Sequence, residues 1–319
     1  MTLRKLFLLW LLLLFGVNIS NAQKSVKTKE AILINGIKQW IVAEGKDDTK
    51  PVLLFLHGGP GFSSRAYSKQ FVKRLRKDFI VVQWDQRETA LTAYFGPYED
   101  ALTVDLFHQD TYEVVEYLRK RFEREKIYLV GFSWGGFLGT HYAKEHPENL
   151  HAYVSVSSIV HANESERRNL QRLLERAALT KNTEAQAQLA KVQIPFRSWE
   201  DLYYLRWWTA ELLGNGASEK IYPKTLFQEW SEKWLPVFRE AAAVDYRKTA
   251  PSLNCPVYFF LSKRDFVANH ELGEAYFQAL QAERKVLIWF HESPHEIPSD
   301  EPEKFSEEML KIARGLAEK

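Results

Sequence analysis

Short apolar runs alternate with helical patterns along most of the chain. Runs of this kind are typical of strands buried in a parallel sheet. They are PVLLFL before His57, FIVVQW before Asp85, KIYLV before Gly131, AYVSVS from Ala152, VYFFL from Val257 and VLIWF from Val286. Because helical patterns such as residues 111–125 lie between most of them, the sequence predicts an α/β fold, with a mainly parallel sheet flanked by helices.

A hairpin is expected ahead of these runs, in the segment AILINGIKQWIVAEG. Two β-rich stretches flank Asn35 and Gly36 there. Both turn residues tolerate positive φ angles, which a two-residue hairpin turn requires.

The alternation breaks once, between His161 and Ala250, where helical patterns continue without a clear strand. We interpret residues 161–250 as a helical cap inserted into one α/β unit, which comprises residues 23–160 and 251–319. The cap is rich in aromatic residues, and we expect most of them to pack its core and some to line a pocket. They include Tyr203, Tyr204, Trp207, Trp208, Trp230 and Trp234.

The first 22 residues have the layout of a signal peptide. Arg4 and Lys5 precede an uncharged apolar run from Leu6 to Val17, and small residues occupy the cleavage-specifying positions Ser20 and Ala22. The apolar run has about 12 residues, fewer than the roughly 20 that a membrane-spanning helix needs. We therefore predict cleavage near Ala22/Gln23, export to the periplasm or the medium, and no stable membrane insertion afterwards. A retained anchor is the alternative.

Composition and charge give no indication of a nucleic-acid partner or of a cofactor. The 319 residues are 45% hydrophobic and 26% charged, as in an ordinary globular protein. Removing residues 1–22 removes two cations and no acid, so the formal net charge falls from +2 to zero. This balance gives no indication of a nucleic-acid partner. The sequence has no HExxH motif and no pair of residues with the spacing typical of metal ligands, so no metal or other cofactor is predicted.

The segment LVGFSWGGFLG is the clearest chemical signal in the chain. Gly131, Ser133 and Gly135 form the pattern G-x-S-x-G between an expected strand and an expected helix, which is the context of a nucleophile elbow. A tight turn there lifts the serine hydroxyl clear of the backbone, and glycines allow strand and helix to approach each other. We therefore predict that Ser133 is a catalytic nucleophile.

A serine nucleophile needs a base and an acid that orients the base, and in this context both follow the serine in the chain. Asp265 follows the strand VYFFL, and His295 follows the strand VLIWF. Both lie beyond strand carboxyl ends, where open α/β sheets place their sites. The prediction is a Ser133–Asp265–His295 triad. His270 and His291 are alternatives, but His291 comes directly after its strand and is expected to reach the site less well.

The oxyanion of a tetrahedral intermediate also needs donors, commonly two backbone N–H groups. One is expected from Trp134, the residue after the nucleophile. The other is expected from the loop HGGPG, which follows the first core strand, and Gly59 is our choice within that loop.

These motifs together resemble the α/β-hydrolase superfamily. HGGPG at residues 57–61, DQR at residues 85–87, GFSWGG at residues 131–136 and FxxSxH at residues 290–295 resemble the proline iminopeptidase group of serine aminopeptidases. The resemblance implies an acyl-enzyme mechanism in which Ser133, Asp265 and His295 act as nucleophile, orienting acid and base.

The resemblance is incomplete in two places. Glu88, Thr89 and Ala90 follow DQR where the group usually has glycines and a small residue, and the cap lacks the ENHYF stretch that supplies an amine-binding acid. The expected function is an exported aminopeptidase acting on small peptides, with an esterase for small acyl esters as the alternative. An aminopeptidase must bind a substrate amine, and the cap offers these acids for it: Glu164, Glu166, Glu200, Asp201, Glu211, Glu229 and Glu232.

Overall fold

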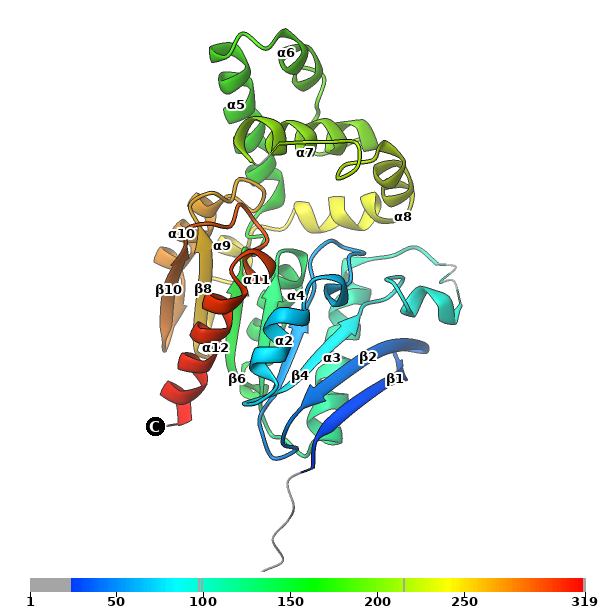
Figure 1. The fold of residues 1–319 in the computed structure, drawn as a ribbon, viewed down its shortest axis with the longest axis vertical. Coiled ribbons are helices and arrows are strands. Elements are labelled where there is room, and N and C mark those ends of the chain that lie inside the picture. Colours follow the sequence, from blue (N-terminus) through cyan, green and yellow to red (C-terminus); the bar gives the residue numbers. More distant parts are fainter. Residues whose placement is uncertain (1–23, 97, 99, 215, 318–319) are drawn as a thin grey trace, which may run out of the picture.

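One eight-stranded sheet lies between two layers of helices, and a further group of helices covers the end of the sheet where the parallel strands finish (Figure 1). The computed structural model describes residues 24–317 apart from 97, 99 and 215. The predicted signal peptide, residues 1–22, lies outside the described residues. Within the described ranges, no helix has both the length and the apolar character needed to span a bilayer.

The predicted strands all form, and they join in the order β1-β2-β4-β3-β5-β6-β8-β10. Pairing is parallel from β4 to β10 and antiparallel at β1 and β2. The α/β fold with a mainly parallel sheet is therefore confirmed. The strands are β1 (Val26–Ile34), β2 (Ile37–Gly45), β3 (Val52–Leu56), β4 (Ile80–Asp85), β5 (Ile127–Phe132), β6 (Leu150–Val156), β8 (Val257–Ser262) and β10 (Lys285–Phe290).

The hairpin is also confirmed. Ile34 of β1 pairs with Ile37 of β2, so the turn between them consists of two residues. Asn35 and Gly36 have φ angles of 44° and 79°, which is the left-handed geometry that a tight hairpin turn needs.

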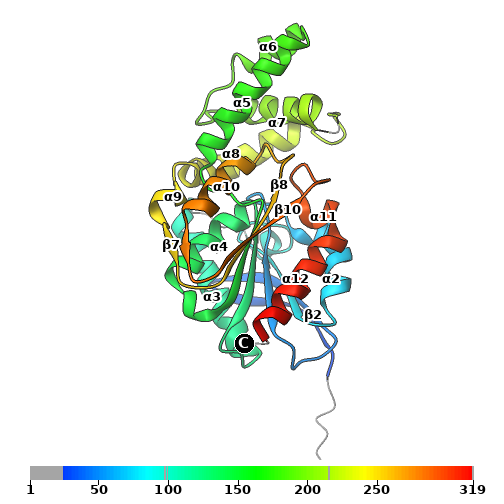
Figure 2. The same cartoon turned by 90° about the vertical axis from the view of Figure 1, so that its left-hand side faces the viewer.

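The two faces of the sheet carry different helices (Figure 2). On one face, α2 (Lys69–Leu75) and α12 (Pro302–Ala317) pack on an apolar cluster centred on Phe55, Phe71 and Phe305. The other face carries α3 (Val104–Arg121), α4 (Trp134–Glu145) and α10 (His270–Ala279). Because both faces are covered, the central strands are buried along their length, as their apolar sequences predict.

The described part of the segment predicted as a cap, residues 161–250, contains the short helix α9 (Tyr246–Thr249) and four further helices, and these four lie above the sheet in Figure 1. They have an apolar cluster of their own, which includes Leu173, Leu205 and Trp208. Of the six cap aromatics named above, only Trp230 lines the cavity described below, and the rest pack against other side chains. The helices are α5 (Ala162–Leu179), α6 (Thr183–Leu189), α7 (Trp199–Leu213) and α8 (Lys224–Ala242). The α/β unit also contains a short helix, α11 (Ile297–Asp300), and the small β7–β9 pair, Ser252–Leu253 with Gln281–Ala282.

Candidate active site

Ser133 sits at a sharp turn between β5 and α4, with φ of 53° and ψ of −114°. The neighbouring glycines are required by close packing. A Cβ at Gly131 would lie 2.5 Å from the Gly135 carbonyl oxygen, and a Cβ at Gly135 would lie 2.1 Å from the Leu56 carbonyl oxygen. Real contacts of this kind are never so short, so only glycine allows the strand and helix to come this close.

Asp265, His295 and Ser133 are joined by hydrogen bonds. Nδ1 of His295 lies 2.8 Å from Oδ2 of Asp265, and Nε2 of His295 lies 3.1 Å from the Ser133 hydroxyl oxygen. The other carboxylate oxygen, Oδ1 of Asp265, accepts the backbone N–H groups of Val267 and Ala268 at 2.9 and 3.0 Å. With Asp265 held as an acceptor, the ring is oriented with a proton on Nδ1 and a lone pair on Nε2 facing the serine.

The electrostatic surroundings make His295 more basic than an ordinary histidine. Burial lowers the pKa of the ring, but the carboxylate of Asp265 outweighs that effect, and Glu296 adds to it while Arg206 opposes it. The net result is a pKa raised above 6.5. A base of this strength matches the task of taking a proton from a hydroxyl near neutral pH.

The alternative histidines lie elsewhere. His291 is exposed, and His270 begins α10 with its Nδ1 lying 3.1 Å from the backbone oxygen of Asp265. Among the described histidines, His295 is the one that contacts the Ser133 hydroxyl. Its own backbone oxygen accepts a hydrogen bond from the Ser157 hydroxyl at 3.0 Å, which fixes the loop that carries it.

The HGGPG loop passes close to Ser133. Gly58 and Gly59 line the same cavity as Ser133, and a Cβ at Gly58 would lie 3.3 Å from that of the serine. Gly59 has a φ of 119°, a conformation that favours glycine. Trp134 is the first residue of α4, so its backbone N–H has no partner within the helix. The loop is also held from the cap, because the Trp230 indole donates to the Pro60 oxygen at 2.8 Å.

His57 fixes the start of this loop without reaching the cavity. Its Nδ1 lies 2.8 Å from the Gly58 oxygen, and its Nε2 lies 3.2 Å from the Gln86 backbone nitrogen. Burial lowers the pKa of His57 to about 4, so the ring is neutral and has one donor and one acceptor for these two groups. The Gln86 side chain adds a second link, from the His57 backbone oxygen to the Trp134 indole.

The residues after DQR show why the departure from glycine is tolerated. Glu88 and Ala90 keep left-handed φ angles of 58° and 44°, the conformation that glycine adopts most readily. The Glu88 carboxylate accepts the Tyr98 backbone N–H at 2.8 Å and pairs with Lys233 of α8 at 2.5 Å. The side chain that replaces a glycine thus ties this loop to the cap.

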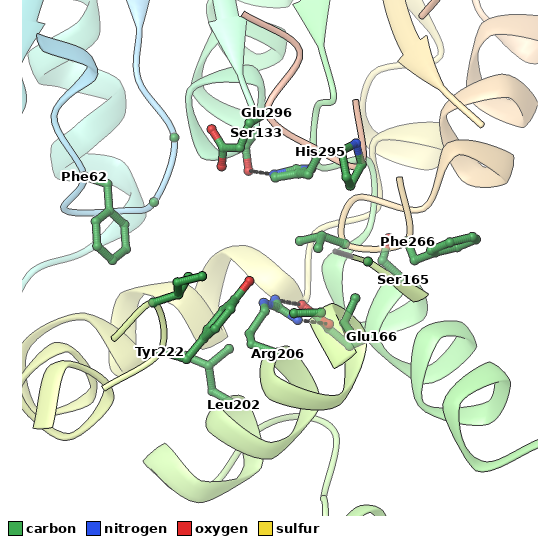
Figure 3. A pocket seen from close by; sticks show the side chains of 18 of the residues that line it. Phe62, Ser133, Ser165, Glu166, Leu202, Arg206, Tyr222, Phe266, His295 and Glu296 are labelled. Atoms are coloured by element: carbon green, nitrogen blue, oxygen red, sulfur yellow. Dashed lines mark hydrogen bonds and ion pairs between the residues drawn. The ribbon is translucent and has the colours of Figure 1, made fainter. Parts of the chain in front are cut away.

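A cavity of about 630 Å³ separates the sheet from the cap, and Ser133 and His295 lie on its sheet side. Most of its lining is apolar, and it includes Phe62, Leu202, Phe227 and Phe266. Figure 3 shows Arg206 and Tyr222 facing Ser133 from the opposite side. A volume of this size suits a small ligand held mainly by apolar contacts with a few polar groups.

None of the seven cap acids named above is an unpaired acid in the cavity. Only Glu166 among them lines the cavity, and it forms a two-point ion pair with Arg206 (Figure 3). Glu164 pairs with Arg168 and Arg247, and Asp201 accepts three backbone N–H groups at the start of α7. The other four are exposed outside the cavity: Glu200, Glu211, Glu229 and Glu232.

Sequence reasoning missed several polar residues of the cavity, among them Glu296, Arg206 and Tyr222. Glu296 had a signal, because it directly follows the predicted base. Arg206 and Tyr222 had no such signal in the sequence, because only the folding of the cap brings them to face the site. Within the described ranges, no group of three or more His, Cys, Asp or Glu side chains has the arrangement of a metal site.

Known proteins resemble this chain in sequence and in fold. Residues 51–288 match the family described as alpha/beta hydrolase fold. A probable aminopeptidase of Bacillus subtilis, YbaC, is 28% identical over 313 residues, which cover 92% of this chain and 98% of the relative. A proline iminopeptidase of Clostridium botulinum is 34% identical over 121 residues, 37% of this chain and 39% of the relative.

Among solved structures, a proline iminopeptidase of Mycobacterium smegmatis has the same fold, with a TM-score of 0.64. Its sequence is 16% identical, and the match covers 91% of this chain and 98% of that one. The family match extends over more than half of the chain and agrees with the sheet order and the strand-turn-helix at Ser133. The chain therefore belongs to the α/β-hydrolase fold family, and it is a hydrolase.

Proposed function

We propose that the protein is an exported serine hydrolase that releases N-terminal residues, proline among them, from small peptides. The observation that carries this proposal is the hydrogen-bonded series Ser133–His295–Asp265 at a cavity of about 630 Å³. A relative that aligns over nearly the whole chain, and is named a probable aminopeptidase, supports the peptide substrate.

Acylation begins when Nε2 of His295 accepts the Ser133 hydroxyl proton as the oxygen attacks the substrate carbonyl carbon. Asp265 stabilises the imidazolium that forms. Negative charge develops on the carbonyl oxygen, and the backbone N–H groups of Gly59 and Trp134 donate hydrogen bonds to it. His295 then passes its proton to the leaving amine, the C–N bond breaks, and the N-terminal residue remains esterified to Ser133.

Deacylation repeats these steps with water. His295 takes a proton from a water molecule that attacks the ester carbonyl, and the same two N–H groups stabilise the second oxyanion. The proton returns to Oγ of Ser133 as the free amino acid leaves. An esterase for small acyl esters would use the same groups, so only the substrate-binding part of the cavity distinguishes the two functions.

The test compares three substrates under identical conditions: a prolyl arylamide, its N-acetylated form and a short-chain aryl ester. We expect hydrolysis of the first and little of the second, because acetylation removes the charge by which an aminopeptidase recognises a free N-terminus. Equal turnover of both arylamides, or turnover of the ester alone, would reject the aminopeptidase and leave a serine hydrolase.

A further inference from the structure

Glu296 lines the same cavity as Ser133 and His295, and Figure 3 shows its side chain on the same side of the cavity as that pair. We propose that Glu296 binds the free ammonium group of the substrate's N-terminal residue, the role for which the sequence offered only cap acids. This assignment rests on the aminopeptidase function proposed above, and it defines the substrate class as peptides with an unblocked N-terminus.

The backbone around Glu296 is fixed, while its side chain has no hydrogen-bond or ion-pair partner among the described residues. Its backbone oxygen accepts the N–H groups of Ser299 and Asp300, each at 2.9 Å, at the start of α11. The side chain makes no capping bond, and no hydrogen bond or ion pair joins its carboxylate to any described residue. An anchored residue thus presents an unpaired carboxylate to the ligand space.

The surroundings of this carboxylate favour a cation. Although the side chain is exposed to the cavity, the protein atoms packed around it raise the pKa of its carboxyl, and Asp300 and Asp265 raise it further while His295 opposes them. Burial also raises the pKa of Tyr67 and Tyr222, and the charge of Glu296 adds to both increases. The carboxylate is therefore poorly compensated in the empty cavity, and a substrate ammonium would supply the missing positive charge.

The short distance between the ammonium group and the reacting carbonyl of the substrate also favours Glu296. In an N-terminal residue the ammonium nitrogen is about 2.5 Å from the carbonyl carbon, since only Cα lies between them. The group that binds the ammonium must therefore lie close to the nucleophile that attacks that carbon. Glu296 directly follows His295, whose ring lies 3.1 Å from the Ser133 hydroxyl, and its side chain lies on the Ser133 side of the cavity.

The only predicted cap acid in the cavity is not available for this role. Both oxygens of Glu166 accept hydrogen bonds from Arg206, whose guanidinium already balances its charge. Figure 3 places this pair across the cavity from Ser133. A substrate ammonium near Glu166 would meet the positive Arg206, whereas near Glu296 it meets a carboxylate that no described residue pairs with.

The decisive variant is Glu296→Gln, which keeps the shape of the side chain and removes its charge. Glu292→Gln is the matched control, because Glu292 lies in the same loop but is exposed and outside the cavity. The wild type and both variants are assayed near pH 7, where the amino group of the arylamide still carries its proton, with the prolyl arylamide, its N-acetylated form and a neutral aryl ester. The ester reports any change in the protonation of His295. Circular dichroism verifies that both variants fold.

We expect Glu296→Gln to lower kcat/KM for the free-amine arylamide by about 10- to 100-fold, the range expected when a charge-assisted hydrogen bond is lost. Ester hydrolysis should change by less than about threefold, and Glu292→Gln should match the wild type. The proposal is overturned if Glu296→Gln keeps the preference of the wild type for the free amine, or if ester and arylamide activities fall together. If the wild type itself ignores acetylation, the aminopeptidase function fails before the variant is considered.

Discussion

Nδ1 of His295 lies 2.8 Å from a carboxylate oxygen of Asp265, and the two residues reach this contact from loops that follow adjacent parallel strands, β10 and β8. The sheet therefore sets the contact, because parallel neighbours end at the same edge. The same edge receives Ser133 from β5, which is why residues distant in the sequence can act together.

Replacing Ser133, the proposed nucleophile, should abolish activity without unfolding the protein. Ser133→Ala removes one oxygen atom, and the loss of such a residue typically lowers turnover on the order of a million-fold. Steady-state kinetics on the purified variant, with thermal unfolding as a control for the fold, checks this. Retention of more than a tenth of the wild-type activity would contradict the mechanism.

The two histidines of the last loop should behave differently. His295→Ala removes the proposed base and should inactivate the enzyme to a similar extent as the serine variant, because residues of a triad act as a unit. His291→Ala alters an exposed side chain and should retain most of the activity. Parallel assays of both variants decide the assignment, and inactivation by His291→Ala alone would reverse it.

Activity should fall as the solution is acidified, with a midpoint above pH 6.5. As the proposed base, His295 must be neutral to accept the serine proton, and its pKa is raised mainly by Asp265 against the effect of burial. The pH profile of kcat/KM on a neutral ester reports this pKa. Glu296→Gln removes one of the negative charges that raise the pKa of His295, so the midpoint should move to lower pH. A shift to higher pH would contradict this effect of Glu296 on His295.

Close packing at the elbow makes a stability prediction. Gly135→Ala would place a Cβ 2.1 Å from the Leu56 carbonyl oxygen, so backbone atoms must move, and we expect destabilisation of about 3 kcal/mol or more. Gly315→Ala in α12 is the control, because its nearest neighbour lies at 3.8 Å and alanine favours helices. Urea unfolding of both variants measures the difference. Equal stabilities would show that the elbow relaxes freely.

Export makes a separate prediction about the first residues. The mature protein should begin near Gln23 and be found outside the cytoplasm, because residues 1–22 have the charges, apolar run and small residues of a signal peptide. N-terminal sequencing of protein from cell fractions tests this. Membrane-bound material with residues 1–22 intact would indicate an anchor.

Much of the fold and of the site was predictable because both depend on local patterns. The apolar runs specify buried strands, and glycines around Ser133 specify a turn that few other residues permit. The residues of the cap that face the site were not predictable in this way. Whether Glu166 is a free acid depends on Arg206, which lies two helices further along the chain. Such pairing arises only from tertiary packing. The sequence therefore offered seven candidate acids in the cap, and none of these seven is an unpaired acid in the cavity.

The contact between Trp230 and Pro60 limits how the cap of this enzyme can be exchanged for that of a relative. The cap and the HGGPG loop share a hydrogen bond, and Trp234 of α8 occupies the space beside Gly61, where a Cβ would lie 2.7 Å from its ring. A cap transplanted from a relative would bring other side chains against that loop. Exchange of caps to obtain new specificity would therefore also disturb the rate of the chemical step, and recombination is expected to succeed only when α8 and the HGGPG loop are inherited together.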